Sequence, residues 1–349
     1  MKVILFSGYN DRAIICCCRF LEKNKIDYNI IAKSDEDKIF LTQYKNRVAS
    51  TRNSPELTKE IILNSCRAVT KDDCFVVPSC EYLNRVLLSN EDYFTSQNIT
   101  FGLCSQDVYS LVSDKYSFRS FCLDNGIQAP KEIKKGDFKY VIKPREYQSP
   151  EGEIKAPQLI DLAEAVPSDC YAEEFVEGES VYFLFYLSKK GDHRVFSQQN
   201  YLQQPEGGSI LSAKSSFYHY DPIAKQIISI LSKIKFFGLV MIEFRKTKNS
   251  WVMIEANPRL WGPMQLTVDS KMGLLEAFFK ENLPDSEQIP ELDPKKFIGF
   301  IDYFWSGGLT GRDVVHLGYE KSLVINQKND IYNRDDTREL YYEESKKTI

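Results

Sequence analysis

Residues 238–262 read GLVMIEFRKTKNSWVMIEANPRLWG and have the clearest pattern of the whole sequence. It contains two apolar runs, Gly238–Phe244 and Trp251–Ala256, on either side of a polar turn. That pattern predicts a β-hairpin whose strands are buried on at least one face. Each strand carries one acid among hydrophobic residues, Glu243 in the first and Glu255 in the second.

Polar residues continue where the second strand ends, at Asn257 and Arg259. Ionised carboxylates are seldom left unpaired in apolar surroundings, because their desolvation is costly. Two carboxylates and an amide oxygen at one end of a hairpin form a set of hard oxygen ligands suited to Mg²⁺. An amphipathic hairpin whose acids face solvent is the alternative interpretation. The Glu-x-Asn-x-Arg order of residues 255–259 favours the metal site.

The string IEANPRLWG at residues 254–262 resembles the ATP-grasp superfamily, of the carboxylate–amine ligase type and its carbamoyl-phosphate-synthase-like branch. The resemblance implies that Glu243, Glu255 and Asn257 hold the Mg²⁺ ions that bridge the phosphates of ATP, with Mn²⁺ as an alternative metal. It also implies that Arg259 lies beside the γ-phosphoryl group or the substrate carboxylate.

The composition is that of an ordinary globular protein. Of 349 residues, 43% are hydrophobic and 27% are charged, which suffices for two or three domains with their own cores. The formal net charge is −4 and the basic residues are scattered, so no surface for nucleic acid is expected. No apolar run approaches the roughly 18 residues needed to span a bilayer, and the N-terminus reads as a strand, not a signal peptide. We therefore expect a cytoplasmic protein that binds neither membranes nor nucleic acid.

Nine cysteines are present, three of them contiguous at positions 16–18. No Cys-x-x-Cys pair or Cys/His spacing typical of zinc occurs, so we interpret them as reduced, partly buried thiols. A reactive thiol within Cys16–Cys18 is the alternative, because helix N-termini lower the pKa of a thiol.

Residues 1–107 alternate between strand-like and helix-like segments, which predicts a parallel sheet with helical crossovers. Ligands on such sheets bind beyond the carboxyl ends of the strands, where Gly8 and Ser79–Glu81 are expected. The predicted strands are Lys2–Phe6, Tyr28–Ala32, Cys74–Val77 and Thr100–Leu103, and the predicted helices are Asp11–Glu22, Pro55–Cys66 and Glu81–Leu88.

Two lysines are candidates for phosphate binding. Residues 113–133 predict a helix that begins at Ser113 or Asp114 and has Lys115 in its first turn. The string KYVIKP at 139–144 predicts a short buried strand ending at Lys143, where an anionic partner offsets the cost of burial. The resemblance implies that both lysines contact ATP phosphates and that Lys143 and Arg259 have catalytic roles. A solvated surface lysine is the alternative for Lys115.

Residues 171–187, YAEEFVEGESVYFLFYL, predict two strands joined by a turn at Gly178. The resemblance implies that the first strand ends in a hinge whose backbone binds adenine. A carboxylate just after the turn can accept hydrogen bonds from two neighbouring ribose hydroxyls. Acids on an edge strand are the alternative. The nucleotide contacts assigned here are Glu173, Glu174, Phe175, Val176 and Glu179.

Two loops complete the comparison with the superfamily. Residues 144–157, PREYQSPEGEIKAP, follow Lys143 and contain one glycine, whereas many members have a Gly/Ser-rich phosphate loop there. Such a loop would have to use Arg145, Ser149 or Gly152. The segment Gly207–Ser209 resembles the Gly-Gly-Ser loop of carboxylate–amine ligases, and an ordinary hairpin turn is the alternative.

The resemblance covers residues 108–285 and extends to the N-terminal part by arrangement only. It implies an α/β fold with an N-terminal pre-ATP-grasp domain (1–107), a two-lobed α+β ATP-grasp domain (108–285, lobes 108–172 and 173–285) and a C-terminal extension (286–349). The implied activity is an ATP-dependent ligase that phosphorylates a small-molecule or peptide carboxylate and couples the acylphosphate to an amine or another nucleophile, with a homodimer as one assembly to consider. A non-catalytic ATP-binding regulatory protein on the same fold is the alternative.

Overall fold

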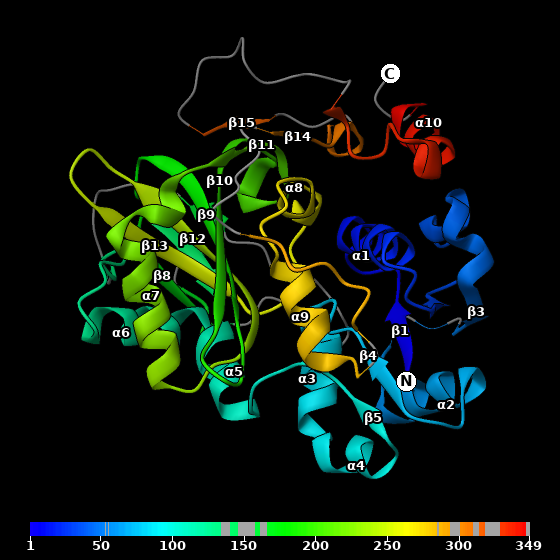
Figure 1. The fold of residues 1–349 in the computed structure, drawn as a ribbon. Helices are drawn as coiled ribbons and strands as arrows, with labels where there is room; N and C mark the ends of the chain where they lie inside the picture. Colours follow the sequence, from blue (N-terminus) through cyan, green and yellow to red (C-terminus); the bar gives the residue numbers. More distant parts are fainter. Residues whose placement is uncertain are drawn as a thin grey trace.

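The computed structural model describes residues 1–52, 54, 56–133, 140–145, 158–160, 166–284, 286–293, 301–309, 314–317 and 329–346. These residues form an α/β protein with a parallel sheet in the N-terminal part and two antiparallel sheets after it (Figure 1). Among them, no helix has both the length and the apolar character to cross a bilayer. The predicted fold class is therefore confirmed.

The N-terminal domain contains a five-stranded parallel sheet of order β3-β2-β1-β4-β5. Alternate residues of β1 enter different cores, Val3 on the face covered by α1 and Ile4 on the face covered by α2 and α3. Both faces of the sheet are thus buried, as expected for parallel strands. The strands are β1 (Lys2–Phe6), β2 (Tyr28–Ala32), β3 (Val48–Thr51), β4 (Cys74–Val76) and β5 (Ile99–Thr100), and the helices are α1 (Asp11–Lys23), α2 (Lys59–Val69), α3 (Glu81–Ser89) and α4 (Glu91–Ser96).

A smaller unit follows, with two helices and a three-stranded antiparallel sheet of order β7-β6-β8. The side chain of Asp114 caps the second helix by accepting a hydrogen bond from Ser117 N at 2.6 Å, which decides between the two predicted start positions. The elements are α5 (Gln106–Ser113), α6 (Lys115–Asp124), β6 (Tyr140–Pro144), β7 (Gln158–Ile160) and β8 (Cys170–Glu174).

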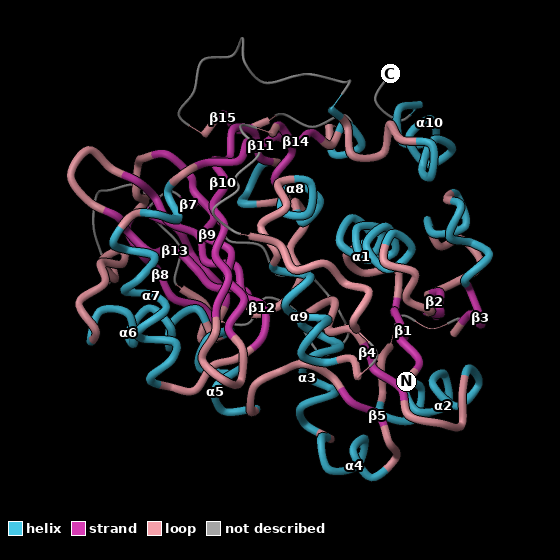
Figure 2. Tube along the Cα trace, in the orientation of Figure 1, coloured by secondary structure: helices cyan, strands magenta, loops and turns pink. Residues whose placement is uncertain are grey.

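The largest sheet is antiparallel, of order β13-β12-β9-β10-β11-β14, with β15 paired to β10 (Figure 2). Its central strand β9 is buried on both faces, because Phe183 and Phe185 pack on α7 while Leu184 and Tyr186 pack on the α9 side. The strands are β9 (Glu179–Leu187), β10 (His193–Gln203), β11 (Ile210–Ser216), β12 (Gly238–Lys246), β13 (Trp251–Asn257), β14 (Asp302–Phe304) and β15 (Val315–His316), and the helices are α7 (Pro222–Lys233), α8 (Met264–Asp269) and α9 (Leu274–Asn282).

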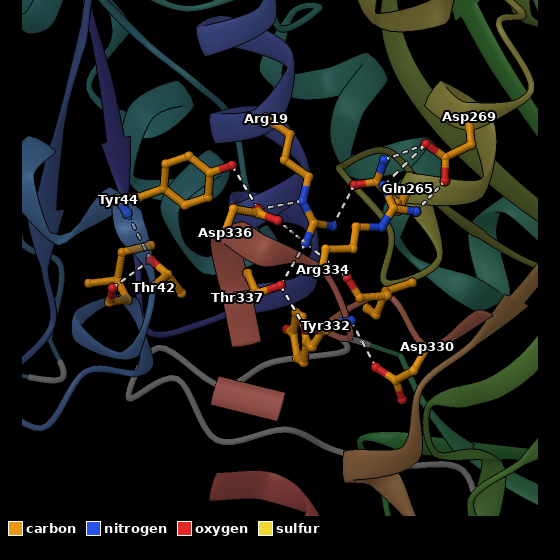
Figure 3. Close-up of polar contacts among 12 residues, drawn as sticks. Arg19, Thr42, Tyr44, Gln265, Asp269, Asp330, Tyr332, Arg334, Asp336 and Thr337 are labelled. Carbon is orange, nitrogen blue, oxygen red and sulfur yellow. Dashed lines mark hydrogen bonds and ion pairs between the residues drawn. The ribbon is translucent and has the colours of Figure 1, made fainter. Parts of the chain in front are cut away.

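The C-terminal segment joins this sheet and then returns to the N-terminal domain. Its strands β14 and β15 pair with β11 and β10, and its helix α10 (Arg338–Lys346) lies near α1 (Figure 1). Figure 3 shows Arg19 of α1 at the centre of the contact, donating to Asp336 at 2.7 Å and to Gln265 of α8 at 2.9 Å. Arg334 pairs with Asp269 of α8 at 2.5 Å. The segment thus ties two parts of the chain together.

Two predicted elements of the N-terminal domain need correction, and one strand was missed. The helix predicted at Pro55–Cys66 begins only at Lys59, because Thr58 caps it by accepting from Ile61 N at 3.3 Å. The strand predicted at Thr100–Leu103 is two residues long, Ile99–Thr100. Strand β3 was not predicted, because its sequence VAST lacks an apolar alternation.

Cys16–Cys18 lie inside α1 and are fully buried. Burial raises the pKa of all three thiols, which agrees with the interpretation as buried thiols and disfavours a reactive thiol there.

Candidate functional site

The hairpin of β12 and β13 brings the two predicted acids together. Glu243 and Glu255 are direct cross-strand partners. Glu243 is 5% exposed and accepts a hydrogen bond from Ser180 Oγ at 3.0 Å, while Arg245 Nη2 lies 3.3 Å from the same carboxylate. Burial raises the pKa of Glu243, Arg245 opposes this, and the neighbouring Glu255 raises the pKa further. Two neighbouring carboxylates of low exposure repel each other, so nearby positive charge is needed to stabilise both in the ionised form.

Lysines supply part of that charge at Glu255. Lys115 Nζ lies 2.8 Å from Glu255 Oε2, and Asn257 Nδ2 donates to Glu255 Oε1 at 2.9 Å. Burial alone would raise the pKa of Glu255, but Lys115 and Lys143 outweigh it and lower the pKa to about 2. Glu255 is therefore an ionised carboxylate at neutral pH.

Both predicted phosphate-binding lysines reach out of the smaller unit toward this hairpin. Lys115 is the first residue of α6 and its side chain is 1% exposed, which excludes the surface-lysine alternative. Lys143 of β6 forms a buried ion pair with Glu173 of β8 and donates to Ile254 O of β13 at 2.9 Å. The start of α6 and the end of β6 thus place the ammonium groups of Lys115 and Lys143 beside strand β13.

A cavity of about 1130 Å³ opens beside these groups. It extends from the turn between β8 and β9 to the two hairpin acids, and the C-terminal strand β15 closes part of its wall. Phe175 is 41% exposed and places an aromatic ring on the wall of this cavity. Predicted nucleotide contacts among the lining residues are Phe175, Val176, Glu179, Glu243 and Glu255.

Glu179 is held in place at this cavity. Its Oε2 accepts hydrogen bonds from Gln199 Nε2 and from the Tyr218 hydroxyl, each at 3.0 Å. Lys246 lies 3.1 Å from the same hydroxyl and over the Tyr218 ring. A residue of β10 and a residue of the short helical turn Tyr218–Tyr220 therefore orient this carboxylate at the cavity wall.

The other predicted hinge acids lie outside the cavity lining. Glu173 is 2% exposed and turned toward Lys143, so its carboxylate serves as the counter-ion of that lysine. Glu174 accepts from Lys131 N at 3.1 Å through its side chain, and its own backbone N–H donates to Lys131 O at 2.9 Å. Of the proposed phosphate loop, Arg145 is described and pairs with Asp114, whereas Ser149 and Gly152 lie outside the described residues.

A second cavity, of about 440 Å³, adjoins the first. It lies at the carboxyl ends of the parallel strands β1, β2 and β4, the zone predicted from Gly8 and Ser79–Glu81. The two cavities share Tyr182, Gly207 and Glu255. They therefore meet at the end of the hairpin.

Asn257 and Arg259 lie at this junction. Arg259 Nη2 donates to Asn257 Oδ1 at 3.3 Å, and Arg259 Nη1 donates to Leu260 O at 3.0 Å. Both residues line the second cavity together with Gly207–Ser209, which sits in the turn between β10 and β11. The guanidinium is thus fixed where the two cavities meet.

Several lining residues were missed from the sequence. Trp261 stands in the string that carries the resemblance, yet its indole gives no pattern that separates it from a core residue. The C-terminal residues offered no signal, because their place depends on pairing with distant strands. The missed lining residues include Tyr9, Asp11, Arg12, Lys33, Trp261, Trp305, His316, Leu317 and Tyr332.

The donor set at the hairpin end fits Mg²⁺ bound together with a phosphate ligand. In the described part of the chain, no group of three or more His, Cys, Asp or Glu side chains is placed to hold a metal ion. Glu243 and Glu255 form a pair, with the Asn257 amide next to it. Glu243 and Glu255, with Asn257 beside them, would hold the ion, which would offset the charge of the two carboxylates and of phosphate oxygens.

Known proteins resemble this chain in structure but not detectably in sequence. No model of a protein family matches it, and no curated protein does. Biotin carboxylase from Campylobacter jejuni, in complex with β,γ-ATP, superposes with a TM-score of 0.62 and 14% identity over 86% of this chain and 74% of that one. Pyruvate carboxylase from Rhizobium etli gives a TM-score of 0.64 and 14% identity over 86% of this chain, which spans 30% of that larger protein.

A structure from Archaeoglobus fulgidus described as an ATP-grasp superfamily protein gives a TM-score of 0.54 and 15% identity, over 79% of this chain and 88% of that one. The chain therefore has the ATP-grasp fold, as the resemblance at residues 254–262 predicted.

Proposed function

We propose that this chain is an ATP-dependent ligase that converts a carboxylate to an acylphosphate and joins it to an amine or another nucleophile. The observation that carries the proposal is that two cavities meet at Glu255, which lies beside Glu243 and whose charge two buried lysines, Lys115 and Lys143, stabilise. A nucleotide in the larger cavity and a carboxylate in the smaller one would face each other there.

The larger cavity takes the nucleotide in this proposal. The backbone near Phe175 and Val176 binds adenine, and Glu179, fixed by Gln199 and Tyr218, accepts from the ribose hydroxyls. The phosphates point toward Lys143 and Lys115, whose buried ammonium groups offset their negative charge. When bound, Mg²⁺ neutralises phosphate oxygens, and Glu243, Glu255 and Asn257 are the residues that would hold it, with Mn²⁺ as an alternative.

The reaction proceeds in two displacements. A carboxylate oxygen of the substrate attacks the γ-phosphorus, and the bond from that phosphorus to ADP breaks. The amine nitrogen then attacks the acyl carbon, inorganic phosphate leaves, and the amine releases a proton. Arg259 and Lys143 bind and orient the transferring group, and exclusion of water protects the acylphosphate. No protein nucleophile is required, because phosphoryl transfer depends on positioning and charge.

Supporting observations come from the fold and from the cysteines. Other proteins of this fold include a biotin carboxylase with a bound β,γ-ATP ligand. The nine cysteines form no disulfide among the described residues, which agrees with a reducing, cytoplasmic setting for small-molecule substrates. A homodimer stays a prediction.

Glu255→Gln tests the proposal. This variant keeps the shape of residue 255 but removes its charge, so ADP formation from Mg-ATP with pools of amino acids and small acids should fall by about 10²–10³-fold. Glu276→Gln is the matched control, since Glu276 is a buried acid outside both cavities. Normal turnover by Glu255→Gln would contradict the assignment of the acid. ATP binding without ADP formation from any pool would favour the non-catalytic regulatory protein.

A further inference from the structure

We infer that the second cavity binds an amino acid, with the ammonium group at Asp11 and the carboxylate among Trp261, Arg12 and Arg259. The inference rests on the proposed function, because it names the substrate class of that cavity. It starts from polar atoms that the fold buries without satisfying. Buried polar groups nearly always have hydrogen-bond partners, so each exception requires an explanation.

Three such exceptions line this one cavity. Tyr9 Oη, Asp11 Oδ1 and Trp261 Nε1 are buried and have no hydrogen-bond partner among the described residues. Trp261 is 1% exposed, and its indole N–H can only donate. A ligand must therefore offer an acceptor to Trp261. Asp11, as a carboxylate, requires a donor.

Asp11 and Trp261 are held in a fixed arrangement relative to each other. Asp11 is the first residue of α1, and the preceding Asn10 donates through Nδ2 to Ser79 O at 3.2 Å and to Leu260 O at 3.0 Å. This side chain fastens the turn between β1 and α1 to the residue next to Trp261. The acceptor Asp11 and the donor Trp261 therefore keep a constant separation, as recognition of a small zwitterion requires.

Positive charge on the same wall lacks an acidic partner. Arg12 Nη1 donates to two neutral acceptors, Ile210 O at 2.9 Å and the Tyr303 hydroxyl at 3.0 Å, and its guanidinium lies 4.1 Å from the centre of the Trp305 ring. A Cβ at Gly262 would overlap Arg12 Nη2, so the glycine permits this close approach. In the described part of the chain no acid pairs with Arg12, and its charge is available to an anion.

Three other charged groups of the cavity already have partners of opposite charge, and Lys33 lies over the Tyr9 ring. Glu81 accepts two hydrogen bonds from Arg85, Lys38 pairs with Glu344 at 2.7 Å, and Glu255 pairs with Lys115. Asp11 thus stands as the acid that can receive a ligand cation. Burial and the nearby Asp37 raise its pKa to about 6, and a bound ammonium group would favour the ionised form.

The chemistry of the ligand follows. It carries an ammonium group for Asp11 and a carboxylate for the donors of Trp261, Arg12 and Arg259, all in the cavity that shares Glu255 with the nucleotide cavity. The volume of about 440 Å³ lies within the range of small-molecule sites. An α-amino acid, phosphorylated on its carboxylate, meets each requirement.

Calorimetry of the full chain with Mg-ADP tests this directly. The twenty amino acids are titrated one by one, alongside propionate and lactate, which lack the ammonium group, and ethylamine, which lacks the carboxylate. We expect at least one amino acid to bind about tenfold or more tightly than any of the three analogues. Binding is measured without turnover, so a failure of the ligase proposal does not obscure the result.

Two variants locate the ligand. Asp11→Asn should abolish the preference for the amino acid over its deaminated analogue, and Trp261→Phe should weaken both about equally, because it removes only the donor to the carboxylate. Asp107→Asn, in the first turn of α5, and Trp251→Phe, outside both cavities, are matched controls that should bind like the wild type. Equal affinity for amino acid and analogue in the wild type, or an unchanged preference in Asp11→Asn, would overturn the inference.

Discussion

Opposing effects meet at the carboxylate of Glu255. Burial would keep it protonated, yet Lys115 and Lys143 lower its pKa to about 2. Its partner Glu243 lies beside Arg245, and burial raises the pKa of Glu243 although Arg245 and Lys143 oppose this. A metal–phosphate complex would stabilise both carboxylates, because a divalent cation offsets two negative charges in a small volume. The ionisation of these two residues is therefore coupled to ligand binding.

The buried pair of Lys143 and Glu173 allows structure and function to be separated. Removing one partner leaves a buried charge, so Lys143→Met should lower the free energy of unfolding by about 3–5 kcal/mol. The double variant Lys143→Met/Glu173→Gln should regain most of that loss but should still fail to form ADP. Urea denaturation and an ADP assay give the two readouts.

Lys346→Met is the control, because its pair with Glu343 is largely exposed and should contribute little. A Lys143→Met protein as stable as the wild type, or a double variant that forms ADP, would contradict the roles given to this lysine.

His219 predicts a dependence of stability on pH. It is 9% exposed, and its Nδ1 forms a hydrogen bond with Ser197 Oγ at 3.0 Å. Burial lowers the pKa of His219 from 6.5 to about 4. The unfolded chain binds the proton more readily, so stability falls as the pH drops from about 6.5 to about 4, by roughly 3 kcal/mol in total. In His219→Gln that contribution should vanish.

Urea midpoints of the His219→Gln variant at pH 7.5 and pH 4.5 measure the difference. His193→Gln is the control, because His193 is exposed. An equal pH dependence of stability in both variants would contradict the account.

Among helices and strands, the sequence predicts those elements whose own residues show an unbroken apolar pattern. Strand Tyr28–Ala32 and helix Asp11–Lys23 were found within a residue of their predicted bounds, because each has an apolar pattern of one clear period. Strands β14 and β15 were not predicted, since each is two or three residues long and pairs with a strand about 90–110 residues earlier. Short strands of this kind depend on tertiary contacts.

The contact between the C-terminal segment and α1 predicts the effect of a substitution at Arg19. Its guanidinium donates to Asp336, Gln265, Thr337 and Ile331 O, and both partners of the ion pair are mostly buried (Figure 3). Arg19→Met should lower the free energy of unfolding by about 3 kcal/mol and make the segment after residue 329 more sensitive to limited proteolysis.

Arg47→Met is the matched control. Arg47 also contacts two acids, Glu22 and Asp27, but these pairs are largely exposed and should contribute less than about 1 kcal/mol. Equal losses in the two variants, or an Arg19→Met protein with unchanged proteolysis, would show that this contact does not hold the segment.

At the scale of the whole molecule, the two cavities differ in how far the sequence predicts them. The acids, the amide and the arginine of the junction stand within 17 residues of one hairpin, so spacing alone suggested a common site. The second cavity combines the ends of three parallel strands, the turn after β10, the segment after β13 and the C-terminal segment. Asp11 and Trp261 are 250 positions apart, and no local pattern joins them. The fold must form before that site can be recognised.

The most direct test of the central claim is calorimetric titration of the purified chain with ATP, with and without Mg²⁺. Two acids facing two buried lysines at the edge of a β-hairpin should give tight binding only when Mg²⁺ is present. The Glu243→Gln/Glu255→Gln variant should lose that dependence on the metal. Binding that is equally strong without Mg²⁺, or no binding of adenine nucleotides at all, would contradict the account.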